Sequence, residues 1–309
     1  MGRVKMEASI NQLPSHIRAE YPFKSHFFEQ PSSEGETVRQ HYLDEGEGPV
    51  IVMLHGNPTW SFYFRNCIQH LSSKGFRCIV PDHIGCGLSD KPQNYPYILE
   101  RRIQDIERLI DHLGIKKMHL IVHDWGGAIG MGYAGRYPQK IDRIAILNSG
   151  AFLSKHIPKR IAFLRTPLLG SFLMRAFNLF AGPAIVMAVQ KPLPETAKAG
   201  LLYPYRTWQD RIAVARFVQD IPMHPTHPSY ECLQTVEANL EHLRGKSIGL
   251  FWGEKDFCFN QHFLNRWTEI FPEAEVHPYS DAGHYLLEDA CDTVPNALSE
   301  FFLKGFSGK

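Results

Sequence analysis

The sequence predicts an α/β fold in which a mostly parallel, doubly wound sheet carries an inserted helical cap. The first observation is a series of short, uninterrupted apolar runs, which are typical of strands buried on both faces of a parallel sheet, at 50–54, 78–80, 118–122 and 144–147. The second is that strand-like and helix-like segments alternate along the chain, as parallel sheets with crossover helices require. The third is a break in this alternation between about residues 150 and 243.

Length and composition are compatible with this organisation. The 309 residues correspond to about two units at ~150 residues per domain, although α/β folds often run longer as one. A hydrophobic content of 44%, with 12% aromatic residues, supports a large core and excludes a disordered chain. With 33 Lys and Arg against 32 Asp and Glu, the net charge is +1, so no global field recruits nucleic acid or acidic lipid.

The cysteines and the chain start bear on the cellular compartment. The six cysteines form no CxxC pair and show no secretory spacing, which favours reduced thiols in a cytoplasmic protein. Residues 1–5 carry no apolar h-region, so no signal peptide is expected. Because the chain lacks a run of about 18 apolar residues, no transmembrane segment is expected either.

The first elements lead to a ligand-binding edge of the sheet. Weak alternation over 23–42, with Gly35 inside it, predicts a hairpin that ends at the turn 44–48. The buried strand 50–54 then runs directly into the sequence HGNPTW at 55–60. This loop therefore follows the carboxyl end of a strand, where open α/β sheets bind ligands.

A second buried strand and a long helix follow. Residues 78–80 predict the strand, and the glycine-bearing segment 81–90 predicts the loop after it. Apolar residues then recur at helical spacing and stop before Gly114, which is suited to the C′ position, at Leu99, Ile103, Ile106, Ile110 and Leu113.

The segment around Asp124 predicts a strand, a sharp turn and a helix. The apolar run 118–122 precedes it, and small residues that allow close packing follow it, at Gly126, Gly127, Ala128 and Gly130. This is the layout of a nucleophile elbow, except that Asp124 stands where the usual G-x-S-x-G motif has serine. A carboxylate needs no base to remove a proton, so Asp124 can attack carbon directly. The alternative is that Asp124 only N-caps the following helix.

The interval 150–243 predicts several short helices inserted as a cap, because it lacks buried-strand runs, is dense in Leu, Phe, Met and Ala, and is punctuated by prolines. The sheet resumes at 248–252, and 274–279 and 294–303 predict the last strand and the closing helix. The predicted domains are therefore a core of 1–149 and 244–309 and a cap of 150–243.

Two polar loops complete a catalytic constellation. Asp256 follows the strand that ends at residue 252, and His284 follows the last strand. The chain order of nucleophile Asp124, acid Asp256 and histidine His284 is that of the α/β-hydrolases. The three residues are therefore the predicted catalytic triad, and no metal site is predicted.

Several motifs carry a resemblance to known families. HGNPTWS at 55–61, VHDWGG at 122–127 and DAGH at 281–284 resemble the haloalkane dehalogenases within the α/β-hydrolase superfamily. A narrower resemblance, to the β-lactone decarboxylases of bacterial long-chain olefin biosynthesis, is carried by PDHIGCGLSDKP at 81–92, RFVQDIP at 216–222, WGEKDF at 252–257 and the segment 281–290. These enzymes were long treated as a third dehalogenase subfamily. The resemblance runs from about residue 22 to 302.

The resemblance implies further roles. The backbone N–H groups of Asn57 and Trp125 match the oxyanion hole, and their side chains match the groups that hold halide in dehalogenases or would hold the ring carboxyl of a β-lactone. The alternative for Trp125 is core packing. In one dehalogenase subfamily the acid follows the strand that here ends at Leu147, but Asn148 is neutral, which leaves Asp256 as the acid.

The function that the resemblance implies is decarboxylation of cis-β-lactones with long alkyl chains to cis-alkenes and CO2. The alternatives are a haloalkane dehalogenase that forms an alkyl-enzyme ester, and a ligand-binding protein of the same fold without turnover. A small hydrophobic substrate, no cofactor and a possible complex with other enzymes of the olefin pathway are implied. The substrate pocket is predicted to involve Trp60, Phe172, Phe177 and Phe217.

Three further segments allow other interpretations. The apolar stretch 168–180 is expected to form cap core and an acyl-chain wall, with a membrane-surface helix as the alternative. His224 and His227 are a conceivable metal pair, but the prolines around them favour an ordinary loop. His83 beside Cys86 suggests a thiol nucleophile, although a role in shaping the loop is preferred.

Overall fold

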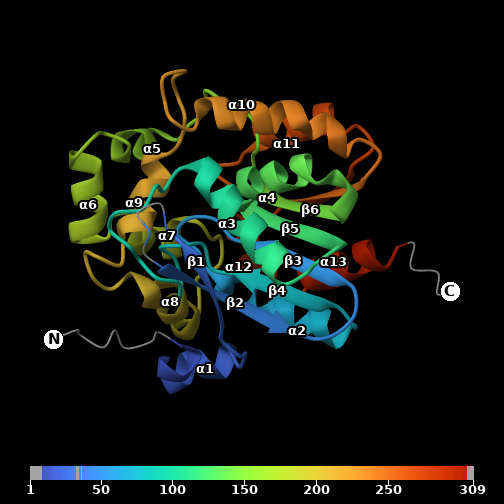
Figure 1. Ribbon diagram of the computed structural model, residues 1–309, viewed down its shortest axis with the longest axis horizontal. Helices are drawn as coiled ribbons and strands as arrows, with labels where there is room; N and C mark the ends of the chain where they lie inside the picture. Colours follow the sequence, from blue (N-terminus) through green and yellow to red (C-terminus); the bar gives the residue numbers. More distant parts are fainter. Residues whose placement is uncertain (1–8, 33–34, 36, 305–309) are drawn as a thin grey trace.

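The computed structural model describes residues 9–32, 35 and 37–304 (Figure 1). Residues 1–5, on which the expectation of no signal peptide rests, lie outside this range. The described residues form one eight-stranded sheet of order β1-β2-β4-β3-β5-β6-β7-β8. The strands are β1 (His26–Pro31), β2 (Thr37–Glu45), β3 (Val50–Leu54), β4 (Arg77–Pro81), β5 (Met118–Asp124), β6 (Ile141–Ser149), β7 (Ser247–Gly253) and β8 (Glu275–Tyr279).

The sheet is parallel except at one edge. β1 pairs with β2 and β2 with β4 in antiparallel register, whereas the pairs from β4 through β3, β5, β6 and β7 to β8 are parallel. The predicted hairpin is therefore the antiparallel edge, and the predicted buried runs form the parallel centre. The carboxyl ends of β3, β5, β7 and β8 consequently face the same side of the molecule.

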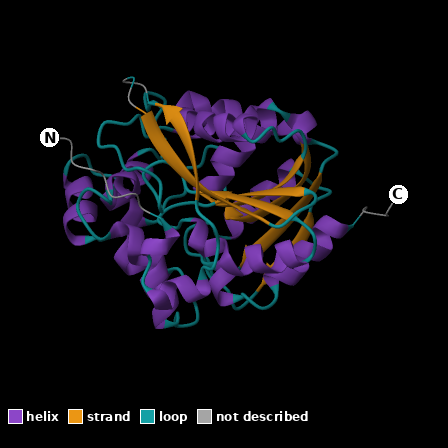
Figure 2. Ribbon diagram, turned by 60° about the horizontal axis from the view of Figure 1, so that its bottom comes forward, coloured by secondary structure: helices purple, strands orange, loops and turns teal. Residues whose placement is uncertain are grey.

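Helices cover both faces of the sheet (Figure 2). The alternation of side chains along a strand sends Val52 and Leu54 of β3 into one core cluster and Ile51 and Met53 into the other. The first cluster is closed by α3 (Leu99–His112), α4 (Trp125–Arg136), α10 (Tyr230–Asn239) and α11 (Gln261–Ile270), and the second by α2 (Arg65–Ser73), α12 (Leu286–Asp289) and α13 (Val294–Leu303). A further helix, α1 (Ser15–Glu20), packs against α8 (Glu195–Leu202), which lies between β6 and β7 in the chain.

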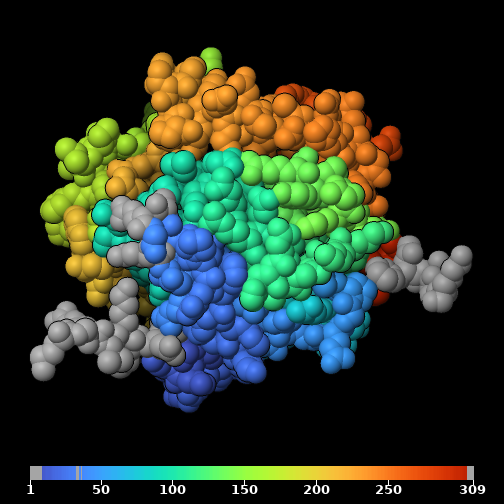
Figure 3. All heavy atoms as spheres, viewed as in Figure 1, coloured from blue at the N-terminus to red at the C-terminus, as the bar shows by residue number. Residues whose placement is uncertain are grey.

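A helical region is inserted between β6 and β7, as the sequence predicts. It begins with α5 (Lys159–Leu164), α6 (Leu169–Phe177), α7 (Ala181–Met187), α8 (Glu195–Leu202) and α9 (Ile212–Gln219), which lie together beside the sheet in Figure 1. The last helix of the interval, α10, instead packs on α4 and α3 of the core (Figure 3). The cap bounds of 150 and 243 remain predictions.

The structure contradicts the expectation that Phe172 and Phe177 of α6 wall a cavity. Their exposed fractions are 50% and 63%, and the two rings contact each other, while Phe172 also contacts Trp208. The buried side of α6 is formed by Gly170 and Met174. Helix periodicity alone does not tell which apolar side of a short helix turns inward.

The described residues include no single helix that is long and apolar enough to cross a membrane. Helices α6 and α7 are long and apolar enough to cross a membrane only when taken together, and they are bent by 76° relative to each other. All six cysteines are free thiols.

Candidate active site

Asp124 occupies the sharp turn between β5 and α4. Its backbone has a φ of 52°, a strained conformation for a residue with a side chain. The turn fits because glycines follow it. A Cβ at Gly126 would overlap the carbonyl oxygen of Leu54, and a Cβ at Gly127 would overlap the hydroxyl of Ser149. Asp124 stands at the N-cap of α4, but its side chain makes no capping hydrogen bond to the helix. The geometry therefore matches the predicted elbow rather than a simple cap.

The two carboxylate oxygens of Asp124 have different environments. Oδ1 accepts a hydrogen bond of 2.7 Å from the backbone N–H of Asn57, which follows β3. Oδ2 lies 3.6 Å from Nε2 of His284. Burial raises the pKa of Asp124, and this effect is opposed by His284 and by the backbone N–H groups of Asn57 and Trp125. Both expected oxyanion-hole donors thus act on the carboxylate of Asp124 itself.

His284 is held from its other side by Asp256. Nδ1 of His284 lies 2.8 Å from Oδ2 of Asp256, and Oδ1 of Asp256 accepts from the backbone N–H of Cys258 at 2.6 Å. Burial lowers the pKa of His284, but the charge and hydrogen bond of Asp256 and the charge of Asp124 outweigh it, so the net shift is upward. The structure therefore brings together the three residues of the predicted triad.

Other carboxylates near His284 have different partners. Glu288 pairs with Arg65 at 2.6 Å, and Asp281 pairs with Lys255 at 3.1 Å on the surface. Neither competes with Asp256 for the imidazole.

Asn148 has a structural explanation. Its Oδ1 accepts from the N–H of Gly253 at 2.8 Å and its Nδ2 donates to the carbonyl of Gly253 at 3.0 Å. The amide thus joins the ends of β6 and β7 as a backbone group would. A carboxylate cannot donate, so an acid at this position would lose half of the pairing.

His123 was not singled out by the sequence, although it directly precedes Asp124. Its ring contacts those of Tyr63 and His284, at centroid distances of 4.6 and 4.7 Å. Burial drives the pKa of His123 well below its ordinary value, so the neutral ring donates from Nε2 to the carbonyl of His284 at 2.9 Å. This contact fixes the backbone of the histidine loop. Without a structure, a buried histidine on a strand gives no signal for such a role.

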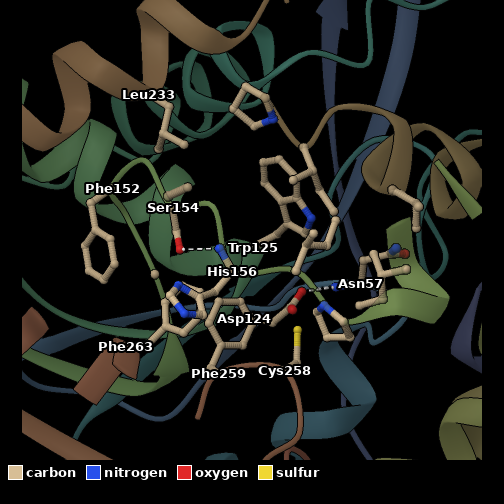
Figure 4. Close-up of a pocket in the computed structure, with 18 of the residues that line it drawn as sticks. Asn57, Asp124, Trp125, Phe152, Ser154, His156, Leu233, Cys258, Phe259 and Phe263 are labelled. Carbon is tan, nitrogen blue, oxygen red and sulfur yellow. Dashed lines mark hydrogen bonds between the residues drawn. The ribbon is translucent and has the colours of Figure 1, made fainter. Parts of the chain in front are cut away.

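The side chains of Asn57 and Trp125 lie beside the carboxylate (Figure 4). Asn57 Nδ2 donates to the carbonyl of Val214 in α9 at 3.1 Å, which ties the loop after β3 to the cap. The Trp125 ring is partly buried, lines the cavity at Asp124 and packs against Phe217 at 5.5 Å. Both residues are therefore placed where a ligand group next to Asp124 would meet them.

Two cavities meet at Asp124, and the space not filled by atoms, including the part open to solvent, is about 840 Å³ in one and about 540 Å³ in the other. In the described part of the chain, neither cavity is lined by a residue that was predicted to form the substrate pocket, so the prediction of Trp60, Phe172, Phe177 and Phe217 as pocket residues is wrong. Trp60 is fully buried and donates its indole N–H to Gly200 at 3.0 Å. Phe217 packs against Trp125, and its ring contacts the guanidinium of Arg102. Phe172 and Phe177 are the exposed side chains of α6 described above.

The remaining candidate residues have local roles. His224 Nδ1 bonds to the hydroxyl of Thr226, and His227 Nε2 bonds to the carbonyl of Gln219. Within the described part of the chain no group of three or more metal-ligating side chains is present. Cys86 is buried, which raises its pKa to about 12, and His83 contacts the carbonyl of His55 instead of a thiol.

Comparison with known proteins agrees with this geometry. A family model described as alpha/beta hydrolase fold matches residues 49–290. The chain is 44% identical to the cis-3-alkyl-4-alkyloxetan-2-one decarboxylase of Shewanella oneidensis, covering 91% of this chain and 88% of the relative. It is 39% identical to the decarboxylase of the same name from Xanthomonas campestris pv. campestris, covering 85% and 92%.

Dehalogenases are more distant. The chain is 31% identical to haloalkane dehalogenase 2 of Mycobacterium tuberculosis, covering 91% of this chain and 96% of the relative. The crystal structure of a haloalkane dehalogenase from Bradyrhizobium elkani superimposes with a TM-score of 0.79 at 22% identity, covering 91% and 98% of the two chains. This likeness supports the fold.

The protein is thus an enzyme of the class in which an α/β sheet presents an elbow residue to a histidine on a later loop. The chain belongs to the alpha/beta hydrolase fold family, in the haloalkane dehalogenase-like group that includes the oxetan-2-one decarboxylases.

Proposed function

We propose that this enzyme converts cis-β-lactones with two alkyl substituents into cis-alkenes and CO2. An oxetan-2-one is a four-membered β-lactone ring, and the relatives named as its decarboxylases match nearly the whole chain more closely than the dehalogenase does. This similarity is the observation that carries the proposal. The triad geometry supports it, because it supplies a nucleophile without requiring any cofactor.

The environment of Asp124 favours attack on a ring carbon. In serine hydrolases the oxyanion hole receives the oxygen of the substrate carbonyl. Here the N–H of Asn57 is already bonded to Oδ1 of Asp124, so it stabilises the carbonyl of an ester formed on Asp124. The free oxygen, Oδ2, therefore attacks the alkyl-bearing carbon next to the ring oxygen. The carbon–oxygen bond of the ring breaks, and its electron pair leaves as a carboxylate that stays in the same molecule.

The second step needs no water. The bond to the carboxylate breaks and CO2 departs, its electron pair forms the C=C bond, and the bond between carbon and Oδ2 of Asp124 breaks, which regenerates the free carboxylate. Attack from behind the ring oxygen places the ester anti to the carboxylate while the alkyl groups stay on one side. Anti elimination then yields the cis-alkene from the cis-lactone.

His284 assists the release of Asp124 in this scheme. Its Nε2 faces Oδ2, and the adjacent Asp256 favours the protonated ring. An imidazolium at this place stabilises the negative charge that returns to Oδ2 as the ester breaks. Asp256 acts through His284 by fixing its tautomer and charge.

The alternative function is dehalogenation, which the mycobacterial relative favours. A haloalkane would form the same kind of ester on Asp124, but that ester contains no carboxylate to lose. His284 would then activate water to hydrolyse it. Both reactions share one scaffold and one nucleophile.

A parallel incubation separates the two functions. The enzyme is given a synthetic cis-3,4-dialkyl β-lactone or 1-bromobutane, with Asp124→Ala as the control, and alkene and bromide are measured. We expect cis-alkene from the lactone and little bromide. Fast bromide release without alkene would establish the dehalogenase instead. Failure to form any product or covalent adduct would revive the ligand-binding alternative.

A cytoplasmic location is supported by the six free thiols. A complex with other enzymes of olefin biosynthesis is implied by the sequence resemblance and stays a prediction.

A further inference from the structure

We infer that the active site is forked, and that each of its two arms takes one of the two alkyl chains of the lactone. This inference rests on the proposed function and adds to it the way in which the substrate is bound.

The two cavities share a junction at the nucleophile. Both are lined by the residues at the fork, which are Asn57, Asp124, Ile161, Phe180 and Cys258. Asp124 and Asn57 come from the core, whereas Ile161 of α5 and Phe180 before α7 come from the cap. The reacting carboxylate thus stands where the two arms separate, as Figure 4 shows for the larger arm.

The larger arm, arm 1, extends between the cap and the core helices. Its own lining includes Phe152 after β6, Leu233 of α10 and Phe263 of α11. Ile221, which follows α9, lines the same arm. Aromatic and aliphatic side chains dominate this lining, as expected for a hydrocarbon ligand.

The smaller arm, arm 2, runs beneath the cap on the side of His284. Its own lining includes Leu164 of α5, Ala184 and Met187 of α7, and Tyr285 beside His284. Apart from the fork, the two arms have no lining residue in common among the described residues. A substitution can therefore alter one arm without touching the other.

The shape of the substrate explains the fork. In a cis-3,4-dialkyl β-lactone, adjacent ring carbons each carry a chain, and both chains leave from one face of the ring. When the ring reacts at Asp124, the two chains must diverge from neighbouring atoms. A linear haloalkane has a single chain and would fill only one arm. The second arm is thus the feature that fits a dialkyl lactone.

The difference in size predicts a chain preference. Counted with the part open to solvent, the empty space of arm 1 is about 840 Å³ and that of arm 2 about 540 Å³, so the longer chain should enter arm 1. Each methylene buried in an apolar arm can tighten binding by up to about fourfold. Filling one arm with a bulky side chain should therefore penalise a long chain on one ring carbon only.

The experiment uses two matched variants, Leu233→Trp in arm 1 and Ala184→Trp in arm 2. Each is assayed for kcat/KM of alkene formation with four cis-lactones, which carry a long chain on C3 only, on C4 only, on both carbons or on neither, with methyl at the short positions. We expect each variant to lose at least about tenfold on one of the two unsymmetrical lactones, with little change on the other. The two variants should affect opposite lactones.

The lactone with two methyl groups reports whether each variant still folds and reacts. If Leu233→Trp fails on it, Ile221→Trp replaces it in arm 1, and Met187→Trp is the corresponding substitute in arm 2. Equal effects of both variants on both unsymmetrical lactones, or effects on the same one, would overturn the forked binding mode. Absence of alkene from every lactone with the unsubstituted enzyme would instead refute the proposed function.

Discussion

The backbone N–H of Asn57 lies 2.7 Å from Oδ1 of Asp124, and this contact leaves Oδ2 as the carboxylate oxygen that attacks in the proposed mechanism. The contact depends on the residue before Asn57, because a Cβ at Gly56 would overlap the Asp124 carboxylate. The close approach of the loop after β3 to the elbow after β5 thus requires glycine at this position.

Gly56→Ala should therefore displace the nucleophile. A misplacement of about 1 Å can cost about 10²-fold in rate, so kcat should fall by at least that factor while the fold is retained. Gly182→Ala is the matched control, because its Cβ would meet only Asn178 at ordinary contact distance of 3.7 Å. Steady-state assays and thermal unfolding of both variants check this. Normal turnover by Gly56→Ala would contradict the close packing of the two loops.

His284→Ala should separate ester formation from ester breakdown. Under the dehalogenase alternative, Asp124 of this variant should still displace bromide from a long-chain bromoalkane, since a carboxylate needs no base. The resulting ester cannot lose CO2 and has no activated water, so it should persist on Asp124. Mass spectrometry of the Asp124 peptide measures this. An unmodified peptide from a folded variant, when the unsubstituted enzyme consumes the bromoalkane, would argue against the assigned role.

Asp256→Asn should cut turnover by about 10⁴-fold, by analogy with the serine-protease triad. The reason is that an amide neither carries the charge that favours the imidazolium nor secures the tautomer of His284.

Asn148→Ala should instead reduce the free energy of unfolding by about 1–3 kcal/mol, because the backbone groups of Gly253 lose their partners. Turnover per folded molecule should change by only a few fold. A larger loss of turnover in Asn148→Ala would mean that the acid is misassigned.

Asp82 should make stability depend on acid pH. It is buried and bonds to Nδ1 of His41 and to the backbone N–H groups of Ser61 and Leu88. Burial alone would raise its pKa, but His41, His55 and the N–H of Leu88 outweigh burial and lower the pKa from 3.8 to about 2. Because the folded-state pKa lies below the unfolded value, the stabilisation is complete above about pH 5 and is lost as the pH falls through 4 towards 2.

This contribution amounts to about 2 kcal/mol at neutral pH. Urea unfolding of the unsubstituted protein and of Asp82→Asn should show a gap in unfolding free energy that narrows from pH 7 to pH 3. A gap that stays constant over this range would show that Asp82 does not titrate in the way its contacts imply.

The sheet and the triad could be predicted from sequence because their signals are local. Uninterrupted apolar runs mark the central strands, and the chain order of Asp124, Asp256 and His284 places each one just after a strand. Since the carboxyl ends of parallel strands meet at one edge, order alone brings distant residues together.

The pocket could not be predicted in the same way. Whether Phe172 faces a cavity or solvent depends on how α6 is rotated against its neighbours, and Gly170 and Met174 turned out to be its buried positions. Trp60 does not face the cavities, because it is buried and donates its indole N–H to the carbonyl of Gly200 in α8. The pairing of Asn148 with Gly253 and the contact of His123 with His284 depend on tertiary geometry that no local pattern encodes.

In the proposed mechanism Asp124 opens the lactone at a ring carbon, and the carboxylate then leaves as CO2. The most direct measurement is the product distribution from one cis-3,4-dialkyl β-lactone labelled with carbon-13 at the ring carbonyl. The alkene is followed by proton NMR and the CO2 by carbon-13 NMR, with the unsubstituted enzyme and with Asp124→Asn. We expect cis-alkene and CO2 in equal amounts from the unsubstituted enzyme and neither from the variant. Formation of the 3-hydroxy acid with the configuration of the lactone retained at both carbons, which is the product of attack at the carbonyl followed by hydrolysis, would contradict this mechanism.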